Sequence, residues 1–141
     1  MKILFATDGS PGALAALSTL VDNLDRFRNP LELLLLNVHP PLPYRSVGAW
    51  VGKDAVARYY DEEGDAALAE SRSLLDARNI GYESVKLVGE PAQSIVTHAS
   101  QAGCDFIAMG TKGHGALANL VLGSVGSKVL ALSSIPLLLL K

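Results

Sequence analysis

The sequence has few of the features that mark secreted, membrane or disulfide-rich proteins. Its single cysteine, Cys104, excludes an internal disulfide and fits a reducing compartment. No apolar run approaches the ~20 residues that a membrane-spanning helix needs, and the first residues do not follow the signal-peptide pattern. From the 141 residues we expect one soluble cytoplasmic domain, residues 1–141, with no membrane partner.

Acidic residues are absent from the C-terminal part of the chain. All 14 Asp and Glu residues lie at or before Asp105, whereas three of the 12 Lys and Arg residues follow it. The net charge of −2 gives no reason to expect a nucleic-acid partner. Tyr59, Tyr60 and Trp50 have no basic cluster beside them, so we expect them to pack rather than to stack on bases.

A glycine-rich stretch, residues 109–128, opens this acid-free part. Five of its twenty residues are glycine, and Thr111, Ser124 and Ser127 carry hydroxyl groups. Glycine lets backbone N–H groups approach and surround an anion, and the N-terminal end of a following helix adds partial positive charge. We interpret the stretch as a phosphate-binding loop and expect Ser124 to cap the helix after it.

Apolar runs and helical periodicities alternate along the chain. No strong hairpin signal joins two strands, so the connections are expected to be right-handed crossovers in a parallel sheet. The predicted fold class is α/β: a single doubly wound, five-stranded parallel sheet with helices on both faces, which is Rossmann-like. Strands are expected at residues 2–7, 31–38, 80–88, 104–109 and 136–140, and helices at 11–27, 53–79, 92–101 and 124–133.

Three predicted strand ends locate a candidate site. In such sheets, ligands bind at the carboxyl ends of the strands, where the strand order reverses. Asp8 follows the first strand, Val38 ends the second and Gly110 follows the fourth, so these residues should share one edge of the sheet. Asp8 has an alternative interpretation as an ordinary turn residue, because Asp-Gly turns are common.

The glycine-rich stretch matches neither of two familiar phosphate loops. A Walker A loop has a lysine after its last glycine, whereas Ser124 and Val125 follow Gly123. The dinucleotide fingerprint belongs after the first strand, with an acidic residue about 20 positions further on. The stretch follows the fourth strand and no acidic residue follows it, so we do not adopt this interpretation.

The pattern Gly110-x2-Gly113-x9-Gly123-Ser124 resembles the nucleotide-binding motif of the universal stress protein family. The resemblance covers essentially the whole chain, including the order of its elements. It implies an ATP-binding member with the adenine nucleotide α-hydrolase-like form of the fold.

The resemblance also implies roles for individual residues. Asp8 would lie at the ribose and phosphates and help to hold a divalent cation, Mg²⁺ or Mn²⁺. Val38 would contact adenine. His114 has two interpretations, an exposed loop residue or a phosphate contact. The residues that would surround the ribose and phosphates are Gly110, Gly113, Gly123, Ser124 and Val125. Met109 and His114 complete the expected nucleotide-binding set.

The site predicts binding more strongly than catalysis. Glu62, Glu63 and Asp65 are expected on a solvated helix face, and no carboxylate is expected beside the γ-phosphate to orient a water molecule. The sequence therefore indicates a nucleotide-dependent stress-response regulator with at most weak ATPase activity. Two alternatives stay open: a dimeric interaction module that binds no nucleotide, and an adenylylating enzyme, which would need a further domain.

The last strand predicts a partner. Residues 136–140 are apolar and would form an unprotected sheet edge, which favours pairing with another strand. We expect a homodimer through this strand, which the resemblance also implies, and a further protein partner that the sequence does not identify.

Overall fold

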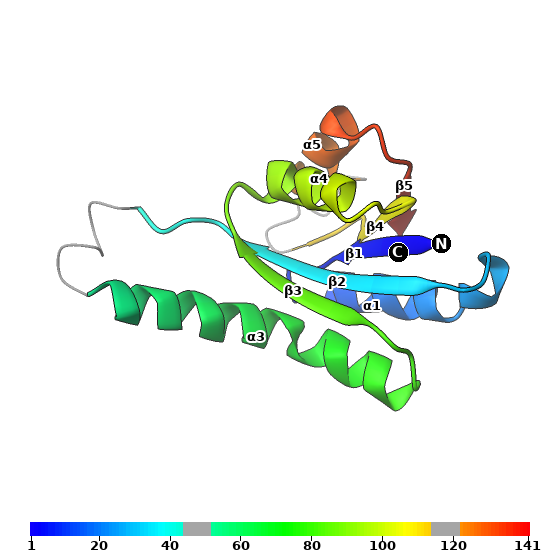
Figure 1. Ribbon diagram of the computed structural model, residues 1–141, viewed down its shortest axis with the longest axis horizontal. Helices are drawn as coiled ribbons and strands as arrows, with labels where there is room; N and C mark the ends of the chain where they lie inside the picture. Colours follow the sequence, from blue (N-terminus) through cyan, green and yellow to red (C-terminus); the bar gives the residue numbers. More distant parts are fainter. Residues whose placement is uncertain (44–51, 114–121) are drawn as a thin grey trace.

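The computed structural model describes residues 1–43, 52–113 and 122–141. Strands and helices alternate along these residues (Figure 1). The elements are β1 (Lys2–Ala6), α1 (Pro11–Val21), the 3-10 helix η1 (Leu24–Arg26), β2 (Glu32–His39), α3 (Lys53–Ala77), β3 (Glu83–Val88), α4 (Pro91–Gln101), β4 (Phe106–Gly110), α5 (Ser124–Leu132) and β5 (Leu137–Leu140).

The five strands form one parallel sheet in the order β3-β2-β1-β4-β5. Leu4 of β1 pairs with Leu34 of β2 on one side and with Ile107 of β4 on the other. The predicted fold class is confirmed, and so is the reversal of strand order between β1 and β4.

Helices cover both faces of the sheet (Figure 1). Ile3 and Phe5 of β1 are buried against α1 and α3, whereas Leu4 packs on the other face with residues of α4 and α5. Burying each of these side chains stabilises the fold by roughly 1.5–3 kcal/mol. Because β1 is covered on both sides, it is an unbroken apolar run rather than an alternating one.

The helix predicted over residues 11–27 ends earlier, at Val21. The side-chain amide of Asn23 donates to the carbonyl of Thr19 at 2.8 Å, and the backbone N–H of Asn23 donates to Leu20 instead, at 3.0 Å. The Asn23 side chain thus takes the acceptor that its own N–H would use in a longer helix. A separate 3-10 turn, Leu24–Arg26, follows.

The strand predicted from residue 80 begins later, at Glu83. Asn79 has a φ of 54°, which reverses the chain after α3, and the N–H of Ile80 donates to the carbonyl of Leu75 at 3.0 Å. A left-handed residue followed by this hydrogen bond is the Schellman motif, which commonly ends α-helices. Residues 80–82 therefore leave the helix before the strand begins.

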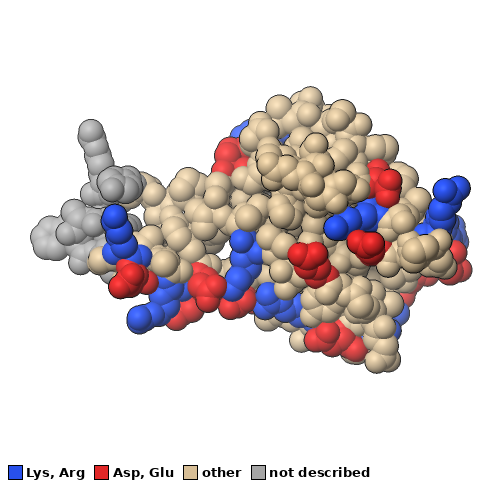
Figure 2. Space-filling model, in the orientation of Figure 1, with Lys and Arg blue, Asp and Glu red and all other residues tan. Residues whose placement is uncertain are grey.

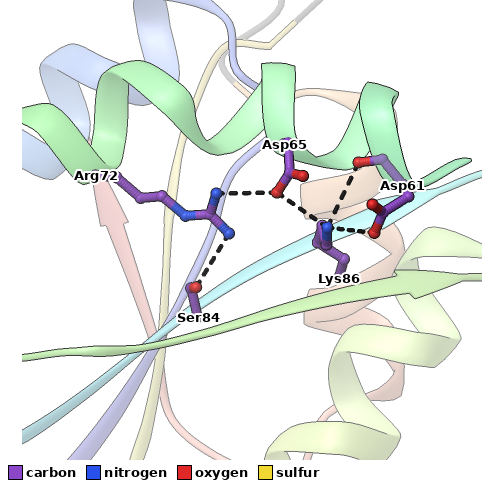
Figure 3. Close-up of polar contacts among 5 residues, drawn as sticks. All are labelled: Asp61, Asp65, Arg72, Ser84 and Lys86. Carbon is purple, nitrogen blue, oxygen red and sulfur yellow. Dashed lines mark hydrogen bonds and ion pairs between the residues drawn. The ribbon is translucent and has the colours of Figure 1, made fainter. Parts of the chain in front are cut away.

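Ion pairs fasten α3 to β3 (Figure 3). Nζ of Lys86 lies 2.5 Å from Oδ1 of Asp61 and 2.9 Å from Oδ1 of Asp65. Arg72 donates to Asp65 at 2.9 Å and to Oγ of Ser84 at 3.1 Å. The Asp65 side chain is 47% exposed, as predicted for a solvated helix face, and it is engaged with β3 as well.

Gly64 makes room for this cluster. It lies in the middle of α3, where glycine costs about 1 kcal/mol relative to alanine. A Cβ at this position would lie 2.7 Å from Cδ of Lys86, so the stem of Lys86 occupies the space. Gly64, which interrupts the helical pattern, thus leaves the space in which the Lys86 side chain of β3 packs against α3.

The charge of Asp65 predicts a pH-dependent contribution to stability. Hydrogen bonds from Lys86 and then from Arg72 hold the pKa of Asp65 below its ordinary value of 3.8. The stabilisation is therefore present above about pH 4 and is lost as the pH falls through the lowered pKa. Asp65→Asn should lower the melting temperature at pH 7, and the difference should shrink as the pH falls below 3.8.

Glu62→Gln is the matched control for this measurement. Glu62 is exposed on the same helix, and it makes no ion pair within the part of the chain that the structure describes. Its melting curves should follow those of the unchanged protein at each pH. A difference for Asp65→Asn that is equally large at pH 3 and pH 7 would contradict the assigned role.

Candidate functional site

A cleft with a volume of about 570 Å³ lies at the carboxyl ends of β2, β1 and β4. This is the size range of small-molecule sites, and the position is where ligands bind in doubly wound sheets. Pro91 and Ile95 of α4 line it from one face of the sheet, and Glu63 and Ala67 of α3 from the other.

The cleft gathers the predicted site residues that the structure describes. His114 lies outside the described residues. The cleft is lined by the other eight residues of the predicted site: Asp8, Val38, Met109, Gly110, Gly113, Gly123, Ser124 and Val125.

The lining changes character across the sheet. The β2 and α4 side is mainly apolar, with Leu36, Val38, Pro40, Pro91 and Ile95. The β4 and α5 side consists mainly of glycines and hydroxyl-bearing residues, namely Gly110, Thr111, Gly113, Gly123 and Ser124. Such a cleft suits a ligand with an apolar, flat part at one end and an anionic part at the other.

Asp8 lies at the centre of the cleft, at the end of β1. Its Oδ1 accepts a hydrogen bond from the N–H of Ser10 at 3.0 Å, which orients the carboxylate. A Cβ added at Gly113 would collide with Oδ2 of Asp8, so the carboxylate lies against the backbone of the glycine-rich stretch. The two predicted site residues are thus in direct proximity.

The turn from β1 into α1 is closely packed. Gly9 has a φ of +78°, and a Cβ there would lie 2.9 Å from Cα of Ala67 in α3. Ser10 caps α1 as predicted, because its Oγ accepts from the N–H of Ala13 at 3.2 Å. A Cβ at Gly12 would lie 2.8 Å from the carbonyl oxygen of Lys112. This turn therefore touches both α3 and the glycine-rich stretch.

The start of α5 differs from the prediction. Gly123, with φ −67° and ψ 170°, is the N-cap, and Ser124 is the first helical residue. The carbonyl of Gly123 accepts the first helical bond, from the N–H of Ser127 at 3.0 Å. Among the described residues no side chain caps this helix end, and Ser124 and Val125 line the cleft. The first turn of α5 can therefore offer its N–H groups to an anion.

Hydrogen bonds hold the two described ends of the glycine-rich stretch together. The N–H of Gly123 donates to the carbonyl of Thr111 at 3.1 Å, and the N–H of Thr111 donates to Leu140 of β5 at 2.9 Å. The N-terminal end of α5 is thereby held beside the end of β4. Gly123, at the far end of the stretch, lines the same cleft as Gly110 and Gly113 for this reason.

The segment after β2 is attached to α3. The His39 ring lies 5.7 Å from the ring of Tyr59 and 5.4 Å from that of Tyr60, both edge-on. The N–H of Leu42 donates to the Tyr60 hydroxyl at 2.7 Å. The two tyrosines pack as predicted, whereas Trp50 lies outside the described residues. The N-terminal half of α3 thus extends beyond the sheet, beside the cleft (Figure 1).

The sequence interpretation missed several residues of the cleft. Asn37 is buried, and its amide donates to the carbonyl of Thr7 at 2.9 Å, joining the ends of β2 and β1. A polar residue inside the apolar run of β2 was the available signal. Glu63 gave no such signal, because its place in the cleft depends on how α3 packs on Gly9.

The charged side chains among the described residues of the cleft are few. Asp8 and Glu63 supply two carboxylates and Lys112 one ammonium group. Within residues 1–43, 52–113 and 122–141, no three His, Cys, Asp or Glu side chains are grouped to hold a metal ion. Mg²⁺ is commonly held by one or two carboxylates together with phosphate oxygens. Asp8, beside the glycine-rich stretch, fits that arrangement.

Comparison with known proteins identifies relatives over the whole chain. The profile of the Universal stress protein family matches residues 1–141. The stress response protein NhaX of Bacillus subtilis is 34% identical over 161 residues, which cover 99% of this chain and 97% of NhaX. The solved structure of the universal stress protein UspA from Lactobacillus plantarum has a TM-score of 0.82 and 21% identity, covering 100% and 97% of the two chains.

Two further solved structures contain adenine nucleotides. A universal stress protein in complex with cAMP has a TM-score of 0.68 and 23% identity, covering 100% of this chain and 97% of the other. An Arabidopsis thaliana family member with AMP bound has a TM-score of 0.70 and 16% identity, covering 100% and 91%. At these identities, the likeness shows a shared fold. In the described part of this chain, each helix is too short or too polar to span a membrane.

The packing of Gly9 on α3 predicts a large effect of one methyl group. Gly9→Ala should destabilise the protein by about 2–4 kcal/mol, because it combines an unfavourable φ with overpacking against the Ala67 backbone. Urea unfolding measures the difference.

Gly103→Ala is the control for this substitution. Gly103 also has a positive φ, +68°, but a Cβ there would meet nothing within 4 Å. Gly103→Ala should lower the free energy of unfolding by only about 1–2 kcal/mol. Equal losses for the two variants would show that Gly9 is not packed against α3 as described.

Proposed function

The chain belongs to the universal stress protein family, and we propose that it binds an adenine nucleotide in the cleft at the carboxyl ends of β2, β1 and β4. The observation that supports this most is the graded lining of the cleft, apolar at β2 and α4 and glycine-rich at β4 and α5. Adenine nucleotides have the same gradation, and relatives of the same fold contain cAMP and AMP.

In this proposal the base occupies the apolar end. Val38 lies near the end of β2 and Pro40 directly follows the strand, and Ile95 lines the cleft from α4. These side chains can enclose a flat heterocycle, while the backbone of Val38 offers hydrogen bonds to its edge.

The phosphates occupy the glycine-rich end. The uncapped first turn of α5, at Ser124 and Val125, offers backbone N–H groups and the positive end of the helix dipole. Gly110 and Gly113 bring further backbone close to the anion, and Lys112 supplies a positive charge.

ATP is proposed to bind with Mg²⁺ or Mn²⁺. Among the described lining residues, the carboxylates of Asp8 and Glu63 face the cleft together with the ammonium group of Lys112, so carboxylate and phosphate charges would lie close together there. A divalent cation between Asp8 and the phosphates would remove that conflict. Asp8 would then act as a ligand of the cation as well as a neighbour of the phosphates.

We expect binding with at most slow hydrolysis. Asp8 is oriented by the N–H of Ser10 and lies against Gly113, and Glu63 enters from the α3 side. The described residues therefore supply no second carboxylate or glutamine beside the glycine-rich end to orient an attacking water molecule. Such a protein suits a regulatory role in the stress response, in the cytoplasm, where its response depends on the nucleotide that it holds.

The edge strand β5 supports a homodimer as part of the proposal. Strand β5 pairs only with β4 among the described strands, and Leu139 is 41% exposed on it. Leu130 and Leu132 of α5 are exposed as well, and the face over α4 and α5 in Figure 2 is nearly free of charge. An uncovered apolar edge favours pairing with a second copy.

The proposed homodimer predicts the mass of the protein in solution. Light scattering at tens of micromolar should give the mass of a dimer, and a strict monomer would contradict this part of the proposal.

Nucleotide binding predicts a ligand-dependent melting temperature. Millimolar ATP with MgCl₂ should raise the melting temperature of the unchanged protein, because the ligand binds only the folded state. The double variant Gly113→Val, Gly123→Val should lose this rise, since the first side chain displaces Asp8 and the second projects into the cleft.

Gly81→Val serves as the matched control. A Cβ at Gly81 meets nothing within 4 Å, and the residue lies outside the cleft. This variant should keep the full rise. Absence of any rise in the unchanged protein would favour the alternative of an interaction module without a nucleotide, and turnover of ATP at several per second would contradict slow hydrolysis.

A further inference from the structure

Glu63 differs from its acidic neighbours on α3. Asp61 and Asp65 point to β3, where both pair with Lys86 (Figure 3). Glu63 instead lines the cleft, and its carboxylate makes no hydrogen bond or ion pair with any described residue. A carboxylate without a cation partner at the wall of a cleft is available to a ligand.

The packing of α3 fixes where this carboxylate enters. Residues four apart in a helix lie on the same face, about 6 Å apart along the axis. Ala67 is four residues after Glu63, lines the same cleft and touches the backbone of Gly9. The Glu63 side chain therefore enters the cleft beside the end of β1. It lies one turn of α3 away from the contact between Ala67 and the Asp8–Gly9 turn.

The end of β1 is also the middle of the cleft. In the sheet, β1 stands between β2, which contributes Leu36 and Val38 to the apolar side of the cleft, and β4, which leads into the glycine-rich stretch. A nucleotide with its base over β2 and its phosphates at β4 has its ribose over β1. The α3 side, where Glu63 enters, then faces the sugar rather than the phosphates.

We infer that Glu63 is a specificity residue that accepts hydrogen bonds from free ribose hydroxyls and disfavours a phosphoester at the sugar. An ionised carboxylate only accepts hydrogen bonds, so it matches the two hydroxyls of a 5′-nucleotide. A 3′,5′-cyclic nucleotide lacks the 3′ donor and carries negative charge there, which the carboxylate repels. The site thus selects a linear adenosine 5′-nucleotide over a cyclic one. This inference rests on the proposed function.

The test compares the selectivity of two charge-neutralising variants. Calorimetry gives Kd for AMP and for 3′,5′-cyclic AMP with the unchanged protein, Glu63→Gln and Glu62→Gln at one ionic strength. Glu62 is exposed on the same helix and does not line the cleft, so its variant controls for overall charge.

The unchanged protein and Glu62→Gln should bind AMP about tenfold more tightly than cyclic AMP, as expected for hydrogen bonds to a charged group. In Glu63→Gln this ratio should fall to within about threefold. An unchanged ratio in Glu63→Gln, or an equal fall in Glu62→Gln, overturns the role of Glu63 and leaves the proposed nucleotide binding in place. Failure of the unchanged protein to bind either nucleotide overturns the proposed function and this inference with it.

Discussion

The turn between β1 and α1 is the constraint on which the cleft depends. Its backbone meets α3 at Gly9 and the glycine-rich stretch at Gly12, at separations that leave no room for a Cβ. Two segments from distant parts of the chain are thereby placed against one turn, and Asp8 is fixed between them. The cleft is thus a consequence of backbone packing, and the chemistry of its lining follows from which segments the turn brings together.

Helix α3 has two roles that depend on each other. Its Asp61 and Asp65 pair with Lys86 of the edge strand β3, and its Arg72 donates to Ser84 of the same strand. Its N-terminal half extends past the sheet, where Tyr60 holds the segment after β2 and Glu63 reaches the cleft. The same helix therefore stabilises the sheet edge and forms one wall of the site. Positive and negative side chains are interspersed along this side of the molecule (Figure 2).

Much of the fold could be predicted from the sequence because the central strands are buried on both faces. Strand β1 and the leucine run of β2 read directly as buried strands, and the Ser10-Pro11 start of α1 follows from local capping chemistry. Asp8, Val38 and Gly110 were accessible for a related reason: they stand at strand ends, which a parallel sheet gathers on one edge. Gly113, Gly123, Ser124 and Val125 were accessible through the glycine-rich motif that resembles the family's.

The predicted helix boundaries were wrong where a single contact decides which of several neighbouring residues begins or ends the helix. Asn23 ended α1 early with a side-chain bond that periodicity does not reveal, and Gly123 rather than Ser124 became the cap of α5. The place of Glu63 depends on helix packing across the turn, which no local pattern encodes.

The central claim is that an adenine nucleotide binds with its base at β2 and its phosphates at α5. Amide chemical-shift mapping on the labelled protein, titrated with ATP and MgCl₂, tests this most directly. The account predicts saturable shifts concentrated at Asp8, Val38, Gly110, Gly113 and Ser124, with little change in β3. Shifts that are absent at millimolar ATP, or that fall on β5 and leave the cleft unperturbed, would contradict it.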